Sequence, residues 1–414
     1  MDRFWERPYG LKFATGIEDT FVPQVSPGRR ALDEYELTGH YERWREDLDL
    51  AAYTGAEMIR YGIPWYRVNP SPHSWDWSWT DRVFDHLLSV GLTPIVDLMH
   101  YGCPLWMERE FANPDYPRHV AEYAARFAER YGEARRFYTP MNEPLLNAVY
   151  CGEIGRWPPA LTGDGGFVNL LRQLVSGIVQ TQRAIRDLVQ DPVFIHVEAP
   201  FRYVGGPEQA ERLRFLEQRS WLVYDLLFGR VGESHSLYRY LSENGLPDED
   251  LARFREYPAE PDVLGINYYP HLTTTELVPG GRERKVWSGT EGLEDVVRGF
   301  HARYEKPIFL TETSVTGGIE ERLRWLRDSL EKVHALRSEG VPLVGFTWWP
   351  LFSLVDWDYR EGRGQVEEYL RHMGMYDLVP DLEGGFLRVE TPVVQAFHAA
   401  TRKVKGGQSG EKGT

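Results

Sequence analysis

Short apolar runs alternate with amphipathic segments along the whole chain. The apolar runs are rich in β-branched and aromatic residues, as buried strands are, and begin near Leu11, Met58, Leu92, Arg135, Val193, Val263, Pro307 and Leu343. The segments between them place apolar residues at helical spacing, most clearly in 41–53, 82–90, 117–131, 169–189, 207–227 and 319–338. Eight strands that alternate with helices predict an α/β fold, a single (β/α)8 TIM barrel.

The chain has 414 residues, more than the roughly 250 of a typical barrel, so we expect elaborated loops at the barrel rim. The longest insertions, 229–261 and 271–298, lie on either side of the sixth predicted strand. We find no internal repeat and no linker. The prediction is therefore one domain over residues 1–402, followed by a disordered tail, 403–414, that is rich in Gly, Lys and Ser.

Composition narrows the classes of partner. The formal net charge of −15 argues against nucleic acid and anionic membranes, which bind basic surfaces. Cys103 and Cys151 are the only cysteines, without CxxC or metal-ligand spacing, and the histidines show no HxH or HExxH pattern. We therefore expect reduced thiols, no metal and no cofactor. The first residues lack the apolar stretch of a signal peptide, so the expected location is cytoplasmic.

Two glutamates come directly after predicted strands. Glu143 follows the fourth strand in the segment Thr139-Pro-Met-Asn-Glu-Pro144, and Glu312 ends the seventh in Leu310-Thr-Glu-Thr-Ser314. The carboxyl ends of parallel barrel strands meet at one rim, where barrel enzymes have their active sites. We therefore expect both carboxylates to face one site.

Two facing carboxylates are the minimum equipment for cleaving a glycosidic bond. A separation of about 5–5.5 Å lets one of them attack the sugar and gives retention, whereas about 6.5–9.5 Å gives inversion. We expect Glu312 to be the ionised nucleophile, favoured by a cation such as Arg60, and Glu143 to be the acid, kept protonated by the charge of Glu312. Asn142 is expected to hold the sugar 2-hydroxyl.

Several motifs resemble those of family 1 glycoside hydrolases, the β-glucosidase and β-galactosidase family of retaining (β/α)8 enzymes. The segments around Glu143 and Glu312 resemble the family's T-F/L-N-E-P acid/base and I/L-T-E-N-G nucleophile segments. Arg60 begins a segment similar to R-F-S-I-S-W, whose Arg lies under the nucleophile. The run from 265 to 269 matches G-I/L-N-Y-Y, which implies that Asn267 and Tyr269 support the nucleophile.

The same resemblance implies a set of sugar-binding residues. His100 lies in a segment similar to H-H-W-D-L-P and matches a histidine that contacts the sugar. Trp349 and Trp357 match the tryptophans of W-S-L-L-D-N-F-E-W, the first of which forms the platform beneath the sugar ring. Asp356 stands where the family has a Glu that grips the 4- and 6-hydroxyls, and its side chain is one methylene shorter.

Other departures from the family pattern lie in the same sugar-binding shell. Tyr101 replaces a Trp, Thr313-Ser314 replace Asn-Gly, and no glutamine follows Ala14-Thr15, where Glu18 or Asp19 is nearby instead. The resemblance thus implies intact catalytic residues and altered sugar-binding residues. It leaves the choice between glucose, galactose and other sugars open.

Two further groups have a structural and a functional interpretation. Trp75, Trp77 and Trp79 alternate after the second strand, and we expect them to pack a loop onto the barrel rather than to stack on a leaving group. Arg360 and Arg363 are expected to be solvated loop charges rather than a site for an acidic or phosphorylated sugar.

The sequence therefore favours a retaining exo-β-glycosidase, similar to β-glucosidases, that hydrolyses a terminal sugar from small β-glycosides through a covalent glycosyl-enzyme intermediate. The preference for β-linkages is implied by the resemblance alone. The alternatives are a catalytically lapsed sugar-binding barrel, an enzyme that cuts within polysaccharides, and a transglycosidase that uses the same carboxylates. The aglycone and any homo-oligomer stay open.

Overall fold

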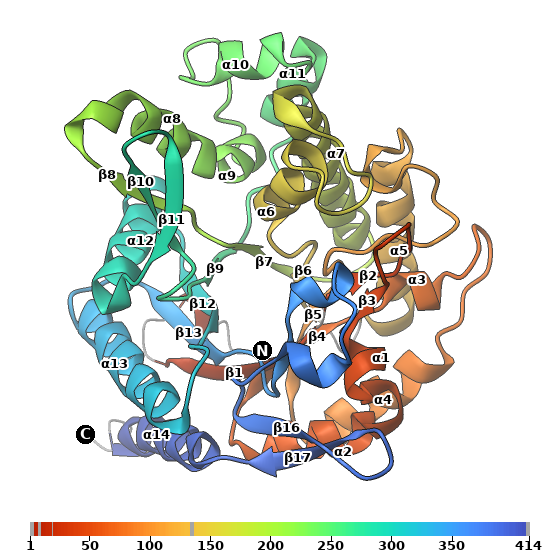
Figure 1. The fold of residues 1–414 in the computed structure, drawn as a ribbon, viewed down its shortest axis with the longest axis vertical. Coiled ribbons are helices and arrows are strands. Elements are labelled where there is room, and N and C mark those ends of the chain that lie inside the picture. The colour runs from red at the N-terminus through yellow and green to blue at the C-terminus, as the bar shows by residue number, and fades with distance from the viewer. Residues whose placement is uncertain (1–3, 7–9, 19, 133–135, 411–414) are drawn as a thin grey trace.

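The computed structural model describes residues 4–6, 10–18, 20–132 and 136–410, with side chains as far as residue 403. Its centre is a closed barrel of parallel strands in the order β1-β13-β12-β9-β7-β6-β5-β4 (Figure 1). The strands are β1 (Lys12–Ile17), β4 (Met58–Gly62), β5 (Thr93–Asp97), β6 (Phe137–Thr139), β7 (Val193–Glu198), β9 (Val263–Asn267), β12 (Ile308–Thr313) and β13 (Leu343–Trp348). Each begins close to its predicted position, so the (β/α)8 prediction is confirmed.

Helices surround this barrel (Figure 1). The longer ones are α2 (His40–Tyr53), α4 (Ser78–Ser89), α5 (Tyr116–Tyr131), α7 (Gly163–Arg186), α8 (Ala210–Ser220), α12 (Gly289–Tyr304), α13 (Ile319–Ser338) and α14 (Pro392–Gly410). The shorter ones are α1 (Glu34–Thr38), α3 (Trp65–Val68), α6 (Pro144–Ala148), α9 (Leu222–Leu227), α10 (Tyr238–Glu243) and α11 (Asp248–Glu256). Within the described residues, none of these helices is long and apolar enough to cross a membrane.

Helix α14 extends into the segment that was predicted to be a tail. Residues 403–410 continue helix α14, where a disordered tail was expected. Buried Val393, Val394 and Phe397 dock the first turns of this helix on the barrel, and extending an existing helix costs much less than starting one. Residues 411–414 lie outside the described part of the chain.

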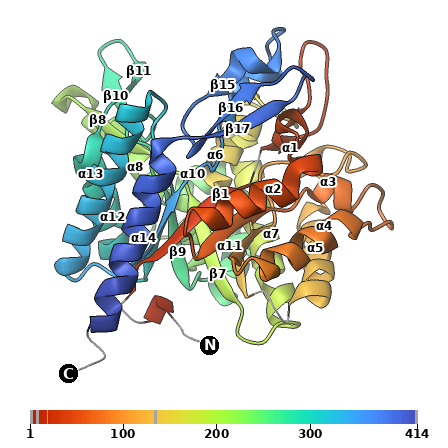
Figure 2. The same cartoon turned by 90° about the horizontal axis from the view of Figure 1, so that it is seen from below.

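The inserted hairpin strands gather at one end of the barrel, and both chain termini lie at the other (Figure 2). The 229–261 insertion contains α10 and α11. The 271–298 insertion contains the hairpin of β10 (Thr274–Val278) and β11 (Arg282–Val286), which joins β8 (Arg202–Gly205) in a small sheet. Three further hairpins pair β2 (Phe21–Val22) with β3 (Leu32–Asp33), β14 (Leu354–Val355) with β15 (Leu370–Arg371), and β16 (Tyr376–Pro380) with β17 (Phe386–Glu390).

Two apolar clusters set where polar groups can lie. Inward-facing side chains fill the barrel interior together with Phe4; they are Ala14, Met58, Ile95, Phe137, Val193, Ile195, Val197, Val263, Phe309 and Val344. A larger cluster fills the space between the strands and the helices. Because a buried polar group needs a hydrogen-bonding partner, the polar residues of the barrel collect beyond these clusters, at the carboxyl ends of the strands.

Candidate active site

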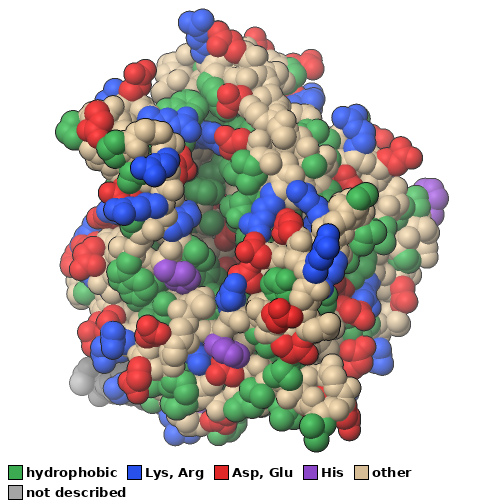
Figure 3. All heavy atoms as spheres, viewed as in Figure 1, with side chains coloured by type: hydrophobic (Ala, Val, Ile, Leu, Met, Phe, Trp, Pro, Cys, Tyr) green, Lys and Arg blue, Asp and Glu red, His purple; other side chains and the backbone are tan. Residues whose placement is uncertain are grey.

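A cavity of about 550 Å³ lies at the carboxyl ends of the barrel strands. In the space-filling view it is the hollow near the centre, with acidic and basic side chains around its mouth (Figure 3). Glu143, just after β6, and Glu312, in β12, both line this cavity, and each is at most 5% exposed. The expectation that both carboxylates face one site is met by this geometry.

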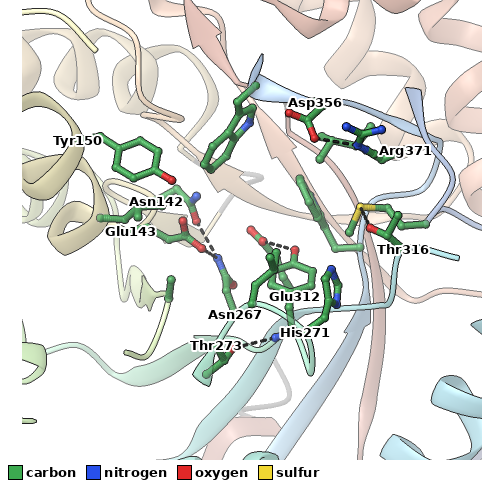
Figure 4. A pocket seen from close by; sticks show the side chains of 18 of the residues that line it. Asn142, Glu143, Tyr150, Asn267, His271, Thr273, Glu312, Thr316, Asp356 and Arg371 are labelled. Carbon is green, nitrogen blue, oxygen red and sulfur yellow. Dashed lines mark hydrogen bonds and ion pairs between the residues drawn. The ribbon is translucent and has the colours of Figure 1, made fainter. Parts of the chain in front are cut away.

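Glu312 points into the cavity (Figure 4) and is held by one cation and one hydroxyl. Arg60, from β4, donates from Nη1 to Oε1 at 2.5 Å, and Tyr269 donates its hydroxyl to Oε2 at 2.7 Å. Burial and the charge of Glu312 raise the pKa of Tyr269 well above its ordinary value, so its hydroxyl keeps its proton and remains a donor. Each carboxylate oxygen of Glu312 therefore accepts a hydrogen bond, one from a guanidinium and one from a hydroxyl.

Arg60 is itself fully buried among carboxylates. Besides Glu312 it pairs with Glu18 (Nη1 to Oε1, 2.7 Å) and with Asp97 (Nη2 to Oδ2, 3.0 Å). Burial lowers the pKa of Arg60, but the surrounding carboxylates outweigh it and raise that pKa overall. The sequence interpretation missed Asp97, although it ends strand β5 as the two glutamates end or follow theirs.

Glu143 lies in a different environment. Asn267 donates from Nδ2 to its Oε1 at 2.7 Å, and the Tyr101 hydroxyl donates to its Oε2. Burial, and next the charge of Glu312, raise the pKa of Glu143 to about 7 against these hydrogen bonds. The sequence interpretation named only the neighbouring charge, whereas burial is the larger cause. A carboxyl with this pKa is protonated in much of the population at neutral pH and can act as an acid.

The amide of Asn267 contacts the other glutamate, Glu143. Asn267 lies beside Glu312 in the β9–β12 register, but its amide donates to Glu143 rather than to the predicted nucleophile. The reason is the hydroxyl of Thr311, which donates to Oδ1 of Asn267 at 2.8 Å and so turns the NH₂ group toward Glu143. Of the predicted supporting pair, only Tyr269 donates a hydrogen bond to the carboxylate of Glu312.

The backbone that carries Glu143 is unusual. Glu143 and its partner Tyr101 both have left-handed φ angles, 46° and 79°, which non-glycine residues seldom adopt and which cluster at functional sites. The N–H of Glu143 donates to the carbonyl of Val197, in β7, at 3.0 Å. This bond fixes the turn after β6 that aims the carboxyl into the cavity.

Asn142 and His100 complete the polar floor of the cavity. Asn142 accepts from Arg60 (3.1 Å) and from Asn267 (3.2 Å), and donates to the Tyr101 hydroxyl at 2.9 Å. His100 places Nδ1 3.0 Å from Asp97 and Nε2 3.4 Å from the Asn142 amide nitrogen. Asn142, whose amide was expected to hold the sugar 2-hydroxyl, thus bonds to residues that contact Glu312 and Glu143.

The remaining predicted sugar-binding residues also line the cavity. Trp349 is buried and clusters with Tyr269. Trp357 packs on Trp157 with ring centroids 4.9 Å apart, and its Nε1 donates to Thr20 at 3.0 Å. Asp356 borders the cavity, but its carboxylate already accepts hydrogen bonds from within the protein.

Two other groups of residues lie outside the cavity. Trp75 and Trp77 stack nearly parallel to Tyr123, as expected for a loop packed on the barrel, and Trp79 donates to a backbone carbonyl at 3.1 Å. Arg360 was expected to be solvated, which is wrong: it is fully buried, and its Nη1 donates to the carbonyls of Val22 and Arg30.

In the described part of the chain, no group of three or more His, Cys, Asp or Glu side chains could hold a metal ion.

A (β/α)8 barrel whose strand ends present two carboxyls in different environments, one beside a cation and one with a raised pKa, is the architecture of a glycoside hydrolase. The sequence also matches the model of glycosyl hydrolase family 1 over residues 15–277. The chain therefore belongs to glycosyl hydrolase family 1 and is a β-glucosidase-like hydrolase.

The relatives of this chain have low sequence identity to it, but the similarity extends over most of their length. A 1,4-beta-D-glucan glucohydrolase of Thermotoga neapolitana is 24% identical over 352 residues, 77% of this chain and 82% of that protein. An aryl-phospho-beta-D-glucosidase of Bacillus subtilis is 25% identical over 374 residues, 76% of each chain. The structure of beta-glucosidase from Thermotoga maritima in complex with noeuromycin superposes with a TM-score of 0.80 at 20% identity, covering 96% of this chain and 98% of that one. That likeness shows the shared fold.

Proposed function

We propose that this protein is a retaining exo-β-glycosidase in which Glu312 is the nucleophile and Glu143 the acid/base. The observation that carries this proposal is the division of partners between the two carboxyls. Glu312 has the guanidinium of Arg60 and the hydroxyl of Tyr269, whereas Glu143 is buried with its pKa raised to about 7.

The reaction then runs in two balanced steps. Glu312 attacks the anomeric carbon while the proton of Glu143 passes to the departing oxygen, which leaves a glycosyl ester on Glu312. The ester has no charge, so one cause of the raised pKa of Glu143 disappears and that pKa falls. Glu143, now a carboxylate, takes a proton from water as the water oxygen attacks the sugar and releases Glu312.

The volume of the cavity favours small substrates. Its volume of about 550 Å³ is in the range of small-molecule sites. The preference for β-linkages is carried by the family resemblance. Location in the cytoplasm and the oligomeric state stay predictions.

Trapping the intermediate tests the nucleophile. The protein is incubated with 2-deoxy-2-fluoro β-glycosides that carry good leaving groups, and peptide masses are measured. We expect one sugar-sized increase on the peptide that contains Glu312, lost in Glu312→Gln. Glu198→Gln is the matched control, because Glu198 is also a buried strand-end carboxyl but does not line the cavity. No adduct with any sugar and no release of nitrophenol from ordinary aryl glycosides would favour the lapsed, binding-only barrel.

A change of leaving group tests the acid. Glu143→Ala is expected to lower kcat/KM about 10²–10⁴-fold on phenyl glycosides, whose leaving oxygen needs a proton. The same variant should lose little kcat/KM on 2,4-dinitrophenyl glycosides, which leave without one. Equal losses on both substrates would assign the proton transfer to another group.

Addition of a sugar acceptor, followed by product analysis, separates hydrolysis from transglycosylation.

A further inference from the structure

A short hairpin at the rim brings a cation into the cavity. Strands β14 and β15 pair antiparallel with Leu354 directly opposite Arg371. Residues that face each other across such a pair point to the same side, so Arg371 shares with Leu354 the side that lines the cavity, while Val355 is buried. Asp356 comes two residues after Leu354 and lies on that side too.

Asp356 and Arg371 are bonded to each other in the cavity wall (Figure 4). Oδ2 of Asp356 accepts from Nε of Arg371 at 2.8 Å, and Oδ1 accepts from the backbone N–H of Asp358 at 2.8 Å. The carboxylate is therefore engaged at both oxygens. Among the described residues, the terminal nitrogens Nη1 and Nη2 of Arg371 have no hydrogen-bond acceptor, and the side chain is 43% exposed.

The position of Arg371 relates it to the sugar ring rather than to the leaving group. In Figure 4 it lies across Glu312 from Glu143. Tyr269, which binds Glu312, belongs to an apolar cluster that continues through Trp349 toward this hairpin. Because the acid must contact the departing oxygen, the leaving group is on the side of Glu143, and the far edge of the terminal sugar meets Arg371.

We propose that Arg371 makes this cavity selective for a terminal sugar that carries a carboxylate, a hexuronic acid, whose two oxygens accept from Nη1 and Nη2. This inference rests on the proposed glycosidase function and specifies its substrate class. A guanidinium edge presents two parallel N–H donors, which match the two oxygens of a carboxylate. The attraction of that carboxylate to the adjacent guanidinium outweighs its repulsion by the more distant Asp356.

The surroundings of Arg371 favour a carboxylate over a phosphate. The neighbouring lining residues Leu354 and Met373 are apolar, and the hydroxyl of Thr316 is engaged with the sulfur of Met373 at 3.8 Å. A phosphate brings a third acceptor oxygen, which would face these groups without a donor. Two other cations line the cavity, but Arg156 is paired with Asp358 at 2.7 Å and Lys285 comes from β11, on a different hairpin.

The test compares 4-nitrophenyl β-D-glucuronide with 4-nitrophenyl β-D-glucoside, using the ratio of their kcat/KM values. We expect the wild-type ratio to exceed one and to fall about 10- to 100-fold in Arg371→Gln, the loss of a bidentate charge-assisted pair. Arg371→Lys keeps the charge without the planar pair of donors and should fall less. Lys285→Gln removes another cation of the cavity and should leave the ratio unchanged. Asp356→Asn removes the nearest repelling charge and should raise it.

Direct binding separates this inference from the proposed reaction. Binding of D-glucuronate and D-glucose is followed by the fluorescence of the tryptophans in the cavity. Glucuronate that binds more tightly than glucose, with an advantage lost in Arg371→Gln, supports the carboxylate site even if no peptide is labelled by the fluoroglycosides. Labelling and glucoside hydrolysis without any preference for glucuronate would overturn the inference and leave the glycosidase standing. A 6-phospho-β-glucoside preferred over the glucuronide would also overturn it.

Discussion

Glu143→Gln is expected to stabilise the protein selectively at alkaline pH. In the folded protein, burial and the charge of Glu312 raise the pKa of Glu143 to about 7 from its ordinary value of 4.5. Between these two pH values the folded protein holds a proton that the unfolded chain has released. The free energy of unfolding therefore falls as the pH rises through this window, and the loss is complete above it.

The size of the effect follows from the two pKa values. Linkage gives a loss of about 2.5 kcal/mol in the free energy of unfolding between pH 5 and pH 8, which Gln at position 143 abolishes. For a chain of 414 residues this corresponds to a shift in Tm of about 3 °C. Any mismatch of the amide with the Tyr101 hydroxyl is the same at both pH values, so it cancels in the difference.

The assay is urea unfolding of wild type and variant at pH 5 and pH 8, followed by tryptophan fluorescence. Glu331→Gln is the control, because Glu331 is an exposed carboxylate of helix α13. It should change the free energy of unfolding equally at both pH values. If the advantage of Glu143→Gln at pH 8 over pH 5 is below about 0.5 kcal/mol, or has the opposite sign, the reasoning is refuted.

Tyr269→Phe removes the 2.7 Å hydrogen bond to Glu312 and should lower kcat/KM for aryl glycosides about tenfold; an unchanged value would mean that the bond does not act in the transition state. Arg60→Met leaves buried carboxylates without their cation and should lower the free energy of unfolding in urea by about 3–5 kcal/mol. The control Arg130→Ala breaks a surface ion pair and should lower it by about 1 kcal/mol or less. Trp77→Ala should leave kcat/KM within about threefold of wild type, because Trp77 does not line the cavity; a larger loss would restore its role in binding the leaving group.

The local pattern of the chain was sufficient for the fold and for the pair of carboxyls. Strands that alternate with helices close into one barrel, and the backbone topology alone brings their carboxyl ends to one rim. Glu143 and Glu312 could be identified because each lies at or shortly after the carboxyl end of such a strand. Asp97, at the end of β5, carries the same signal, so it too could have been predicted from the sequence.

What only the tertiary structure decided is how these side chains are paired. The hydroxyl of Thr311 turns Asn267 toward Glu143, and a rim hairpin binds Asp356 to Arg371, 15 residues further along the chain. Arg360 is likewise buried against backbone carbonyls of a distant segment. A strand end is a local feature that periodicity reveals. The partner of a buried polar group depends on which segments the fold brings within hydrogen-bonding distance, because burial without a partner costs free energy.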